Sequence, residues 1–389
     1  MRPIFNKKSI GSIEALSDAL QVNKHILQNT ADNIFQHYHP YEIKKKDGGT
    51  RLIHIPTLHL KIIQKRINKN IFDNVTYPDY LHGGIEDKDY VKNALSHANA
   101  EAIICLDIKN FYPSITQTRV SKIFQYFFKF PEDVSNLLAK LCCHEERVPQ
   151  GACTSSHLAN LAFFDSEYHF ASFCKSKKYT YTRLLDDITI SKSSAFSDTE
   201  ISKAIASVKS IISPHGIKLN NKKQKIVSRS NPKDLMEVTG LWLNRGRPRA
   251  HRSYRKVVRL EMHICEKMAK TDRFSEEYHK LHNRVSGKVS KLSYLGHHEA
   301  TNYRDTLQKI LPLYDIHKAT NLHKNALILS KVNANIRKKF AYFKRYSKIN
   351  YELNILARNN KPLSKTIRNI LSNCKPSGLR DDLLYNEPI

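Results

Sequence analysis

The sequence predicts an α+β domain followed by a helical domain. Between residues 41 and 244, short runs with the character of strands alternate with runs that have the spacing of helices. After about residue 250 only helical spacing remains, in a part of the chain that is rich in lysine and arginine. With 389 residues, 40% of them hydrophobic, the chain is long enough for two or three domains with cores of their own.

The chain is strongly basic, with a formal net charge of +28 and a pI of about 9.7. This excess favours a polyanionic partner, because lysine and arginine gain free energy when they displace counterions from phosphates. The alternative is a protein whose surface is merely basic. A membrane partner is disfavoured, because no apolar run approaches the roughly 20 residues of a spanning helix.

Two further features predict a cytoplasmic protein. The first residues, MRPIFNKKSIGSIEAL, lack the apolar block of a signal peptide. The seven cysteines are an odd number without a CxxC pair, which is typical of free thiols in a reducing compartment.

The first elements predicted are a helical segment, a hairpin and another helix. Apolar residues have helical spacing over 12–37 and again over 58–72, where the outer face is basic. In YEIKKKDGGTRLIHIP, residues 41–56, two alternating runs flank DGG, which predicts a β-hairpin because glycine tolerates positive φ. The basic residues near its tip are Lys44, Lys45, Lys46 and Arg51.

The next elements place acidic residues at strand ends. AEAIICLDI, residues 100–108, is typical of a buried strand and ends near Asp107. A helical region follows to about residue 145, and then a glycine turn leads into another helix. YTRLLDDITIS, residues 181–191, predicts a strand, a tight turn that contains Asp186 and Asp187, and a second strand. GLWLN, residues 240–244, predicts one more strand.

If these strands are neighbours, the carboxylates of Asp107, Asp186 and Asp187 converge and raise one another's pKa values. Two Mg²⁺ ions would remove that repulsion, since magnesium prefers hard oxygen ligands. Such a pair of ions can activate an attacking hydroxyl and stabilise a leaving pyrophosphate. Taken alone, the aspartate pair is also compatible with a solvated turn or a one-metal phosphodiesterase. The basic hairpin and net charge favour a polymerase.

Three motifs in this order, CLDIKNFYPSI, PQGACTSSHLANL and YTRLLDDITIS, resemble the reverse transcriptase family. The resemblance extends from the basic hairpin at 44–51 to about residue 312. It implies an α+β right-hand polymerase with fingers, palm and thumb, and with a helical C-terminal extension. The domains expected are an N-terminal helical segment (1–40), fingers and palm (41–244), a helical thumb (245–315) and a basic helical extension (316–389).

The resemblance also implies roles for single residues. Asp107, Asp186 and Asp187 would hold two Mg²⁺ ions, with the Ile108 carbonyl as a further ligand. Lys223, with Lys222 as its rival, would protonate the leaving pyrophosphate. The residues expected to bind the incoming deoxynucleotide are Lys46, Arg51, Tyr112, Gln150 and Gly151. Arginine suits this task because its guanidinium matches phosphate oxygens. The bulky ring of Tyr112 would exclude a 2′-hydroxyl.

Two further motifs resemble hallmarks of the retron reverse transcriptases. NALSH runs from Asn93 to His97, and VTG comprises Val238, Thr239 and Gly240. The resemblance implies that these residues bind a structured noncoding RNA that is both template and primer. A 2′-hydroxyl of that RNA would start the DNA chain, which gives a branched RNA–DNA product in defence against phage. A separately encoded effector protein would be a further partner.

The sequence departs from the family pattern at four positions. Leu184 replaces the tyrosine of the usual Tyr-x-Asp-Asp, Cys153 and Ser156 stand where prolines are usual, and Asn110 replaces an aspartate. These departures keep two alternatives open. One is a defence reverse transcriptase outside the retrons with template-free synthesis. The other is a retired polymerase that only binds RNA as a scaffold, although a pure binder gains nothing from clustered carboxylates.

The chain beyond the thumb offers a weaker signal. NIRKKFAYFKRYSK, residues 335–348, interleaves cations with aromatic residues, a composition that can hold phosphates and stack on bases. Ile336, Phe340 and Phe343 fall on one face if the stretch is a single helix, which favours core packing for them. RNA contact is then expected from the exposed cations. Gly287, in the helical stretch expected to form the thumb, would allow either close packing of helices or close approach of the backbone.

Overall fold

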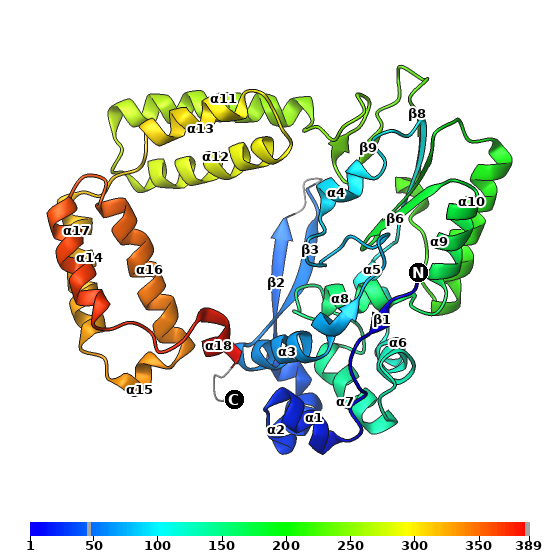
Figure 1. The fold of residues 1–389 in the computed structure, drawn as a ribbon, viewed down its shortest axis with the longest axis horizontal. Coiled ribbons are helices and arrows are strands. Elements are labelled where there is room, and N and C mark those ends of the chain that lie inside the picture. Colours follow the sequence, from blue (N-terminus) through cyan, green and yellow to red (C-terminus); the bar gives the residue numbers. More distant parts are fainter. Residues whose placement is uncertain (45–47, 386–389) are drawn as a thin grey trace. The chain divides into compact units, whose positions relative to one another are not determined.

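The computed structural model describes residues 1–44 and 48–385, and contacts within the chain divide it into two compact units. The first unit comprises residues 1–248 and the second residues 249–388. The helices and strands of both units are labelled in Figure 1.

The centre of the first unit is a four-stranded antiparallel sheet with strand order β6-β7-β5-β8. Its strands are β5 (Ala102–Asp107), β6 (Thr180–Leu184), β7 (Asp187–Lys192) and β8 (Lys225–Ser228). β5 is the most apolar strand and lies between two neighbours, so the prediction of a buried strand over 100–108 is confirmed. The strand–turn–strand predicted at 181–191 is also confirmed, as β6 and β7.

The predicted hairpin at 41–56 forms a separate two-stranded sheet from β2 (Tyr38–Lys44) and β3 (Thr50–Pro56). Before it, the helical spacing of 12–37 is divided into α1 (Ile13–Leu20), α2 (Lys24–Asp32) and a 3₁₀ turn, η1 (Ile34–His37). The division follows from local chemistry, because Gln21 adopts a left-handed conformation and Asn23 caps α2.

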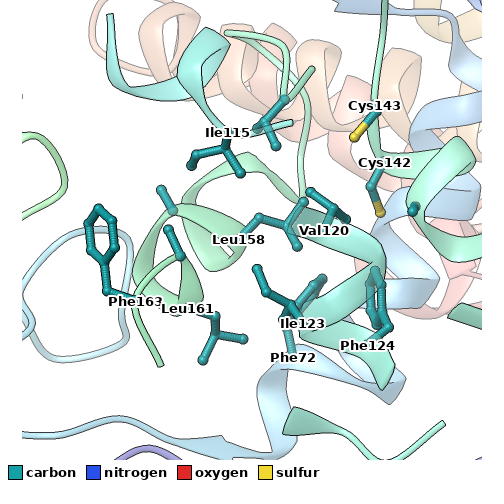
Figure 2. Packing of buried hydrophobic residues seen from close by; sticks show 14 of the residues in the cluster. Phe72, Ile115, Val120, Ile123, Phe124, Cys142, Cys143, Leu158, Leu161 and Phe163 are labelled. Carbon is teal, nitrogen blue, oxygen red and sulfur yellow. The ribbon is translucent and has the colours of Figure 1, made fainter. Parts of the chain in front are cut away.

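Helices cover the sheet and contribute most of the core. Those N-terminal to β6 are α3 (Leu58–Asn70), α4 (Tyr90–Leu95), α5 (Phe111–Ser114), α6 (Gln117–Lys122), α7 (Glu132–Cys142), α8 (Ser155–Leu161) and α9 (Glu167–Ser176). α10 (Asp198–Ile212) follows β7. In Figure 2, Val120 and Ile123 lie close to Leu158, and Cys142 lies in the same apolar cluster. Burial raises the pKa of the Cys142 thiol to about 12, so this residue packs as an apolar group.

The last strands of the first unit form a small hairpin. β9 (Glu237–Val238) pairs with β10 (Leu241–Trp242), so the predicted strand at 240–244 is present but short. The two residues between them, Thr239 and Gly240, both have positive φ, +48° and +76°. A two-residue turn of this kind matches the twist of the strands, although a β-branched residue rarely adopts this conformation.

The second unit is helical and has two hydrophobic clusters. The first cluster lies among α11 (Arg252–Thr271), α12 (Glu276–Tyr294) and α13 (Ala300–Lys309). The second lies among α14 (Ile316–Ser330), α16 (Phe340–Leu356) and α17 (Lys361–Ser372). Short helices α15 (Ala334–Arg337) and α18 (Arg380–Tyr385) complete the unit. No atom of the described residues lies within 4 Å of a Cβ built on Gly287, so the first alternative, close packing of helices, is wrong.

The prediction that Ile336, Phe340 and Phe343 share one helical face is wrong for Ile336. The stretch 335–348 is not one helix, because α15 ends at Arg337 and α16 begins at Phe340. Ile336 therefore does not share a face with Phe340, and its side chain is 44% exposed, whereas that of Phe340 is 8% exposed. Asn333 caps α15 and thereby sets its start, and the break at 338–339 gives α16 its own rotational register.

Candidate active site

The sheet brings the two predicted groups of aspartates together. Asp107 on β5 is the register partner of Asp187 on β7, directly across the ladder. The Ile108 N–H donates to the Asp186 carbonyl at 2.9 Å, which fixes the second aspartate beside the end of β5. The expectation that these three carboxylates converge is therefore confirmed as geometry.

The turn that places the aspartates is strained and closely supported. Leu185, the first of its two central residues, has φ +57°, a conformation for which glycine is the usual choice. A Cβ added to Gly83 would overlap the Leu185 side chain, so glycine is required there for close approach. The Tyr80–Gly83 segment runs beside β6, with the His82 N–H donating to the Arg183 carbonyl at 2.9 Å.

A fully buried ion pair lies beneath this turn. The Arg183 guanidinium donates to both Glu167 oxygens, at 2.6 and 2.7 Å. Its other N–H groups donate to the carbonyls of Ala159, Asn160 and Leu185 at 3.0–3.2 Å. All five donors are thus satisfied, and the arginine ties α8 and α9 to the aspartate turn. The sequence analysis did not predict this ion pair. The feature of the sequence that indicates it is an arginine inside a strand of otherwise apolar and β-branched residues.

Burial and mutual repulsion make the aspartates unusual acids. Burial first, and then the charges of Asp186 and Asp107, raise the pKa of Asp187 to about 6. Burial and the charge of Asp107 also raise the pKa of Asp186, against the lowering effects of Lys223 and Arg51. The cluster therefore holds negative charge that the surrounding protein only partly compensates.

The carboxylate of Asp107 is held by two neighbours from the segment after α10. The Lys223 ammonium lies 2.8 Å from Oδ2, and the Asn220 amide donates to Oδ1 at 3.1 Å. The hydrogen bond to Asp107 raises the pKa of Lys223. Lys223 thus remains a protonated donor beside the aspartates at neutral pH.

The donor set suits a hard divalent cation. Carboxylate oxygens in a partly buried, under-compensated cluster are the ligands magnesium prefers. Among residues 1–44 and 48–385, no three His, Cys, Asp or Glu side chains form a ready-made metal site. For the three aspartates there is a physical reason why they do not form such a site. The Asp107 carboxylate is already bonded to the Lys223 ammonium.

A cavity of about 440 Å³ lies against the aspartates. Asp107 and Asp187 line it on one side. Leu184, which replaces the usual tyrosine, lines it too, as do Thr239 and Gly240 of the β9–β10 turn. The lysines that face it are Lys222, Lys223 and Lys225. The cavity lining therefore combines carboxylates, among them Glu237, with three ammonium groups.

The residues expected to bind a nucleotide lie on connected elements. The His54 N–H of β3 donates to the Gln150 carbonyl at 2.8 Å, which joins the hairpin of Arg51 to the turn before α8. Gly151 has φ +116°, and a Cβ there would lie 2.8 Å from the His54 carbonyl oxygen, so only glycine fits. Arg51 is exposed and its charge acts on Asp186. Lys46 lies outside the described residues.

Comparison with known proteins agrees with this geometry. Residues 43–298 match the family model described as reverse transcriptase (RNA-dependent DNA polymerase). The chain is 37% identical over 374 residues to the Retron Se72 reverse transcriptase of Salmonella heidelberg, covering 94% of this chain and 97% of that one. It is 30% identical over 387 residues to the Retron Ec48 reverse transcriptase of Escherichia coli, covering 94% and 93%. The chain belongs to the retron reverse transcriptases.

Solved structures that resemble this reverse transcriptase include a telomerase from Candida albicans in complex with an RNA fragment. The TM-score is 0.42 at 11% identity, covering 91% of this chain and 65% of that one. Family membership therefore rests on the sequence matches. It makes the enzyme an RNA-directed DNA polymerase with the α+β right-hand fold of its family.

The two retron motifs of the enzyme meet in space. The Thr239 hydroxyl donates to the Tyr90 carbonyl of α4 at 2.9 Å, so the VTG turn is bound to the helix in which the NALSH motif begins. Asn93 and His97 are buried, at 0% and 1% exposure, and Val238 is buried as well. The His97 ring bonds Ser191 and Thr182 at 2.7 Å each. Of these buried side chains, His97 joins β6 to β7, whereas the Asn93 amide has no hydrogen-bond partner among the described residues. Thr239 and Gly240 line the cavity.

Within the parts of the chain that the structure describes, no helix is both long enough and apolar enough to cross a bilayer.

Proposed function

We propose that this reverse transcriptase copies a structured noncoding RNA into DNA by two-metal-ion nucleotidyl transfer. The observation that supports this best is the pairing of Asp107 with Asp187 in the sheet, with Asp186 beside them. Burial, and then the charges of the neighbouring aspartates, raise the pKa values of Asp186 and Asp187, so a cation at this place would be stabilised. When bound there, two Mg²⁺ ions would neutralise the aspartates, lower the pKa of the attacking hydroxyl and stabilise the leaving pyrophosphate.

The other residues of the site would then position the reactants. Asp107, Asp186, Asp187 and the Ile108 carbonyl are the proposed metal ligands. Arg51 would hold the triphosphate, and Gln150 and Gly151 would set the distance between hairpin and palm through the contact with His54. Tyr112 is half-buried near Asp186, whose charge adds to burial in raising the pKa of the phenol to about 12. It would face the sugar as a neutral ring.

Lys223 is the proposed donor of a proton to the leaving pyrophosphate. Its pKa is raised by Asp107, so it holds its proton at neutral pH. Lys222 lines the same cavity, but the 2.8 Å contact with Asp107 favours Lys223. Proton donation by a positioned side chain typically contributes about 10²–10⁴ in rate.

We further propose a retron-type product, in which the RNA is both template and primer and the DNA remains joined to it through a 2′-hydroxyl. The relatives named retron reverse transcriptases support this, as does the bond between Thr239 and Tyr90 that links the two retron motifs. Thr239 and Gly240 would contact the RNA from the cavity wall. Asn93, His97 and Val238 would contribute to RNA binding by holding that wall. The enzyme would act in the cytoplasm against phage, with a separately encoded effector.

A second candidate is DNA synthesis without a template, in a defence system outside the retrons. Leu184 favours it, since an aliphatic side chain lines the cavity where relatives usually have a tyrosine. The loss of a ring and hydroxyl there would change how the primer end is held.

The test is to purify the protein from its native locus and sequence the nucleic acid bound to it. The preparation is repeated with Asp186→Asn and Asp187→Asn, and with Asp305→Asn as a control at an exposed aspartate on α13. A discrete DNA joined to a structured RNA, lost in the first two variants and kept in the control, supports retron-type synthesis. Repetitive or untemplated DNA supports the second candidate. RNA alone, unchanged in all variants, would leave a binding scaffold and refute the polymerase.

A further inference from the structure

The positive charge of the chain is concentrated in its last helices. Residues 316–380 contain fifteen lysines and arginines and one glutamate, a formal charge of +14, which is half of the chain's +28. These 65 residues comprise α14 to α17, the segment after α17 and the first residue of α18, and they have a hydrophobic cluster of their own. So strong a local excess indicates that this module binds a polyanion.

The helix α16 has a second face besides the one in the core. Tyr342, Ile349 and Leu353 are buried against α14 and α17, which lie beside α16 in Figure 1. A different set of its residues lines a cavity of about 490 Å³. Among the residues that line it are Phe343, Tyr346, Asn350, Tyr351 and Asn354, whose spacing places them on one face of the helix. Lys375, from the segment after α17, lines the cavity too.

Two aromatic rings of this face stack on other rings of the same helix. Phe343 stacks on Phe340 with ring centres 6.2 Å apart, and Tyr346 stacks on Tyr342 at 6.5 Å. Phe340 and Tyr342 are themselves buried, so each ring above them packs against a side chain that is held in the helical unit. Tyr351 is 57% exposed, which leaves a large π surface open to a ligand.

The polar side chains of the groove add hydrogen-bonding groups between the rings. The Arg368 guanidinium of α17 donates to Asn354 Oδ1 at 3.2 Å, so the NH₂ group of that amide points away from the arginine. Asn350, one turn earlier, is exposed on the same face. An amide can donate to and accept from the edge of a base, and Lys375 can meet a phosphate.

We propose that this face of α16, with Lys375, binds unpaired nucleotides of an RNA. Aromatic stacking needs bases that have left their helix, whereas a duplex offers such a surface mainly its phosphates. Rings, amides and an ammonium in one groove on a module of charge +14 therefore fit a single strand better than a duplex. The inference goes beyond the proposed function, since it concerns binding and requires no catalysis.

The experiment measures the affinity of the full-length protein, without dNTPs, for a short fluorescein-labelled single-stranded RNA and for the corresponding RNA duplex. Fluorescence anisotropy is read at one fixed salt concentration. Tyr351→Ala should weaken binding of the single strand at least about fivefold, the lower end of what one stacked base contributes. It should change binding of the duplex by less than about twofold. Tyr351→Phe, which keeps the ring, should bind the single strand as the wild type does.

Tyr126→Ala is the matched control, because that tyrosine is 54% exposed but lies in the first unit. It should leave both affinities unchanged. The site is refuted if Tyr351→Ala binds the single strand normally, or if it loses single strand and duplex equally. The same measurement with a single-stranded DNA of the same sequence tests whether the groove is specific for RNA or binds any single strand. Loss for RNA alone means that the groove senses the ribose, and equal loss for DNA means that it binds single strands in general. Asp187→Asn should keep this binding although DNA synthesis is lost.

Discussion

Replacing His97 by leucine tests whether the NALSH motif braces the palm. The imidazole is 1% exposed and joins the Thr182 hydroxyl of β6 to the Ser191 hydroxyl of β7. Leucine has a similar size but leaves both hydroxyls without this partner. A buried polar group that loses its partner costs about 1–3 kcal/mol. We therefore expect His97→Leu to lower the free energy of unfolding of the first unit by about 2–5 kcal/mol at pH 7.5.

The pH dependence of this loss gives a sharper criterion. Burial lowers the pKa of His97 to about 3, whereas the unfolded chain has the ordinary value of 6.5. Between these values the unfolded state binds the extra proton, so stability present above pH 6.5 is lost as the pH falls. At pH 5.5 this loss is about 1.3 kcal/mol, nearly independent of how far the folded pKa lies below 5.5. The variant lacks this loss.

The difference in unfolding free energy between wild type and His97→Leu should therefore be about 1.3 kcal/mol smaller at pH 5.5 than at pH 7.5. Urea titrations followed by the fluorescence of Trp242, the single tryptophan, report on the first unit. Burial also lowers the pKa values of His82 and His157 to about 4. Both histidines are present in the wild type and in the variant, so their contributions to the unfolding free energy cancel in the difference. An unchanged or larger difference at pH 5.5 would refute the reasoning.

Three shorter predictions concern other parts of the first unit. Glu167→Gln should lower the unfolding free energy by about 3–5 kcal/mol in urea titrations, because it leaves the Arg183 charge buried and uncompensated. Glu276→Gln, which removes an exposed ion pair of the second unit, is the control and should leave this free energy unchanged. Gly151→Ala should raise the KM for dNTP in primer extension, since its Cβ would push against the hairpin of Arg51; a normal KM would show that this contact does not set the nucleotide pocket. Tyr112→Ala should increase incorporation of ribonucleotides relative to deoxynucleotides, and unchanged selectivity would exclude it as the gate.

Patterns with a local cause were predictable from the sequence. The hairpin at 41–56 follows from DGG between alternating runs, and the strand over 100–108 follows from a short apolar run. The strand–turn–strand around Asp186 and Asp187 is equally local. Convergence with Asp107 needed one further assumption, that the strands are neighbours. The register of β5 and β7 bears this out.

Features that depend on tertiary packing were not predictable. Arg183 and Glu167 are 16 residues apart in different elements, and either one alone would pass for a surface charge. The resemblance implied RNA binding for His97, yet both hydrogen-bond partners of its ring lie in the sheet. In α16 the prediction of core packing is confirmed for Phe340, which is buried, but Phe343 lies outside the core cluster and lines the groove. The break after α15 removes Ile336 from the face of Phe340.

The turn between β6 and β7 combines unfavourable local geometry with support from several neighbouring segments. Leu185 has a positive φ, which costs a residue other than glycine about 1–2 kcal/mol, and the aspartates beside it repel each other. Neither feature would persist on a flexible loop. The turn is held because Arg183 bonds the Leu185 carbonyl from within the core, while Gly83 allows a second segment to press against the same residue. Substitutions in this support should therefore disturb the positions of the aspartates, and with them catalysis, before they unfold the domain.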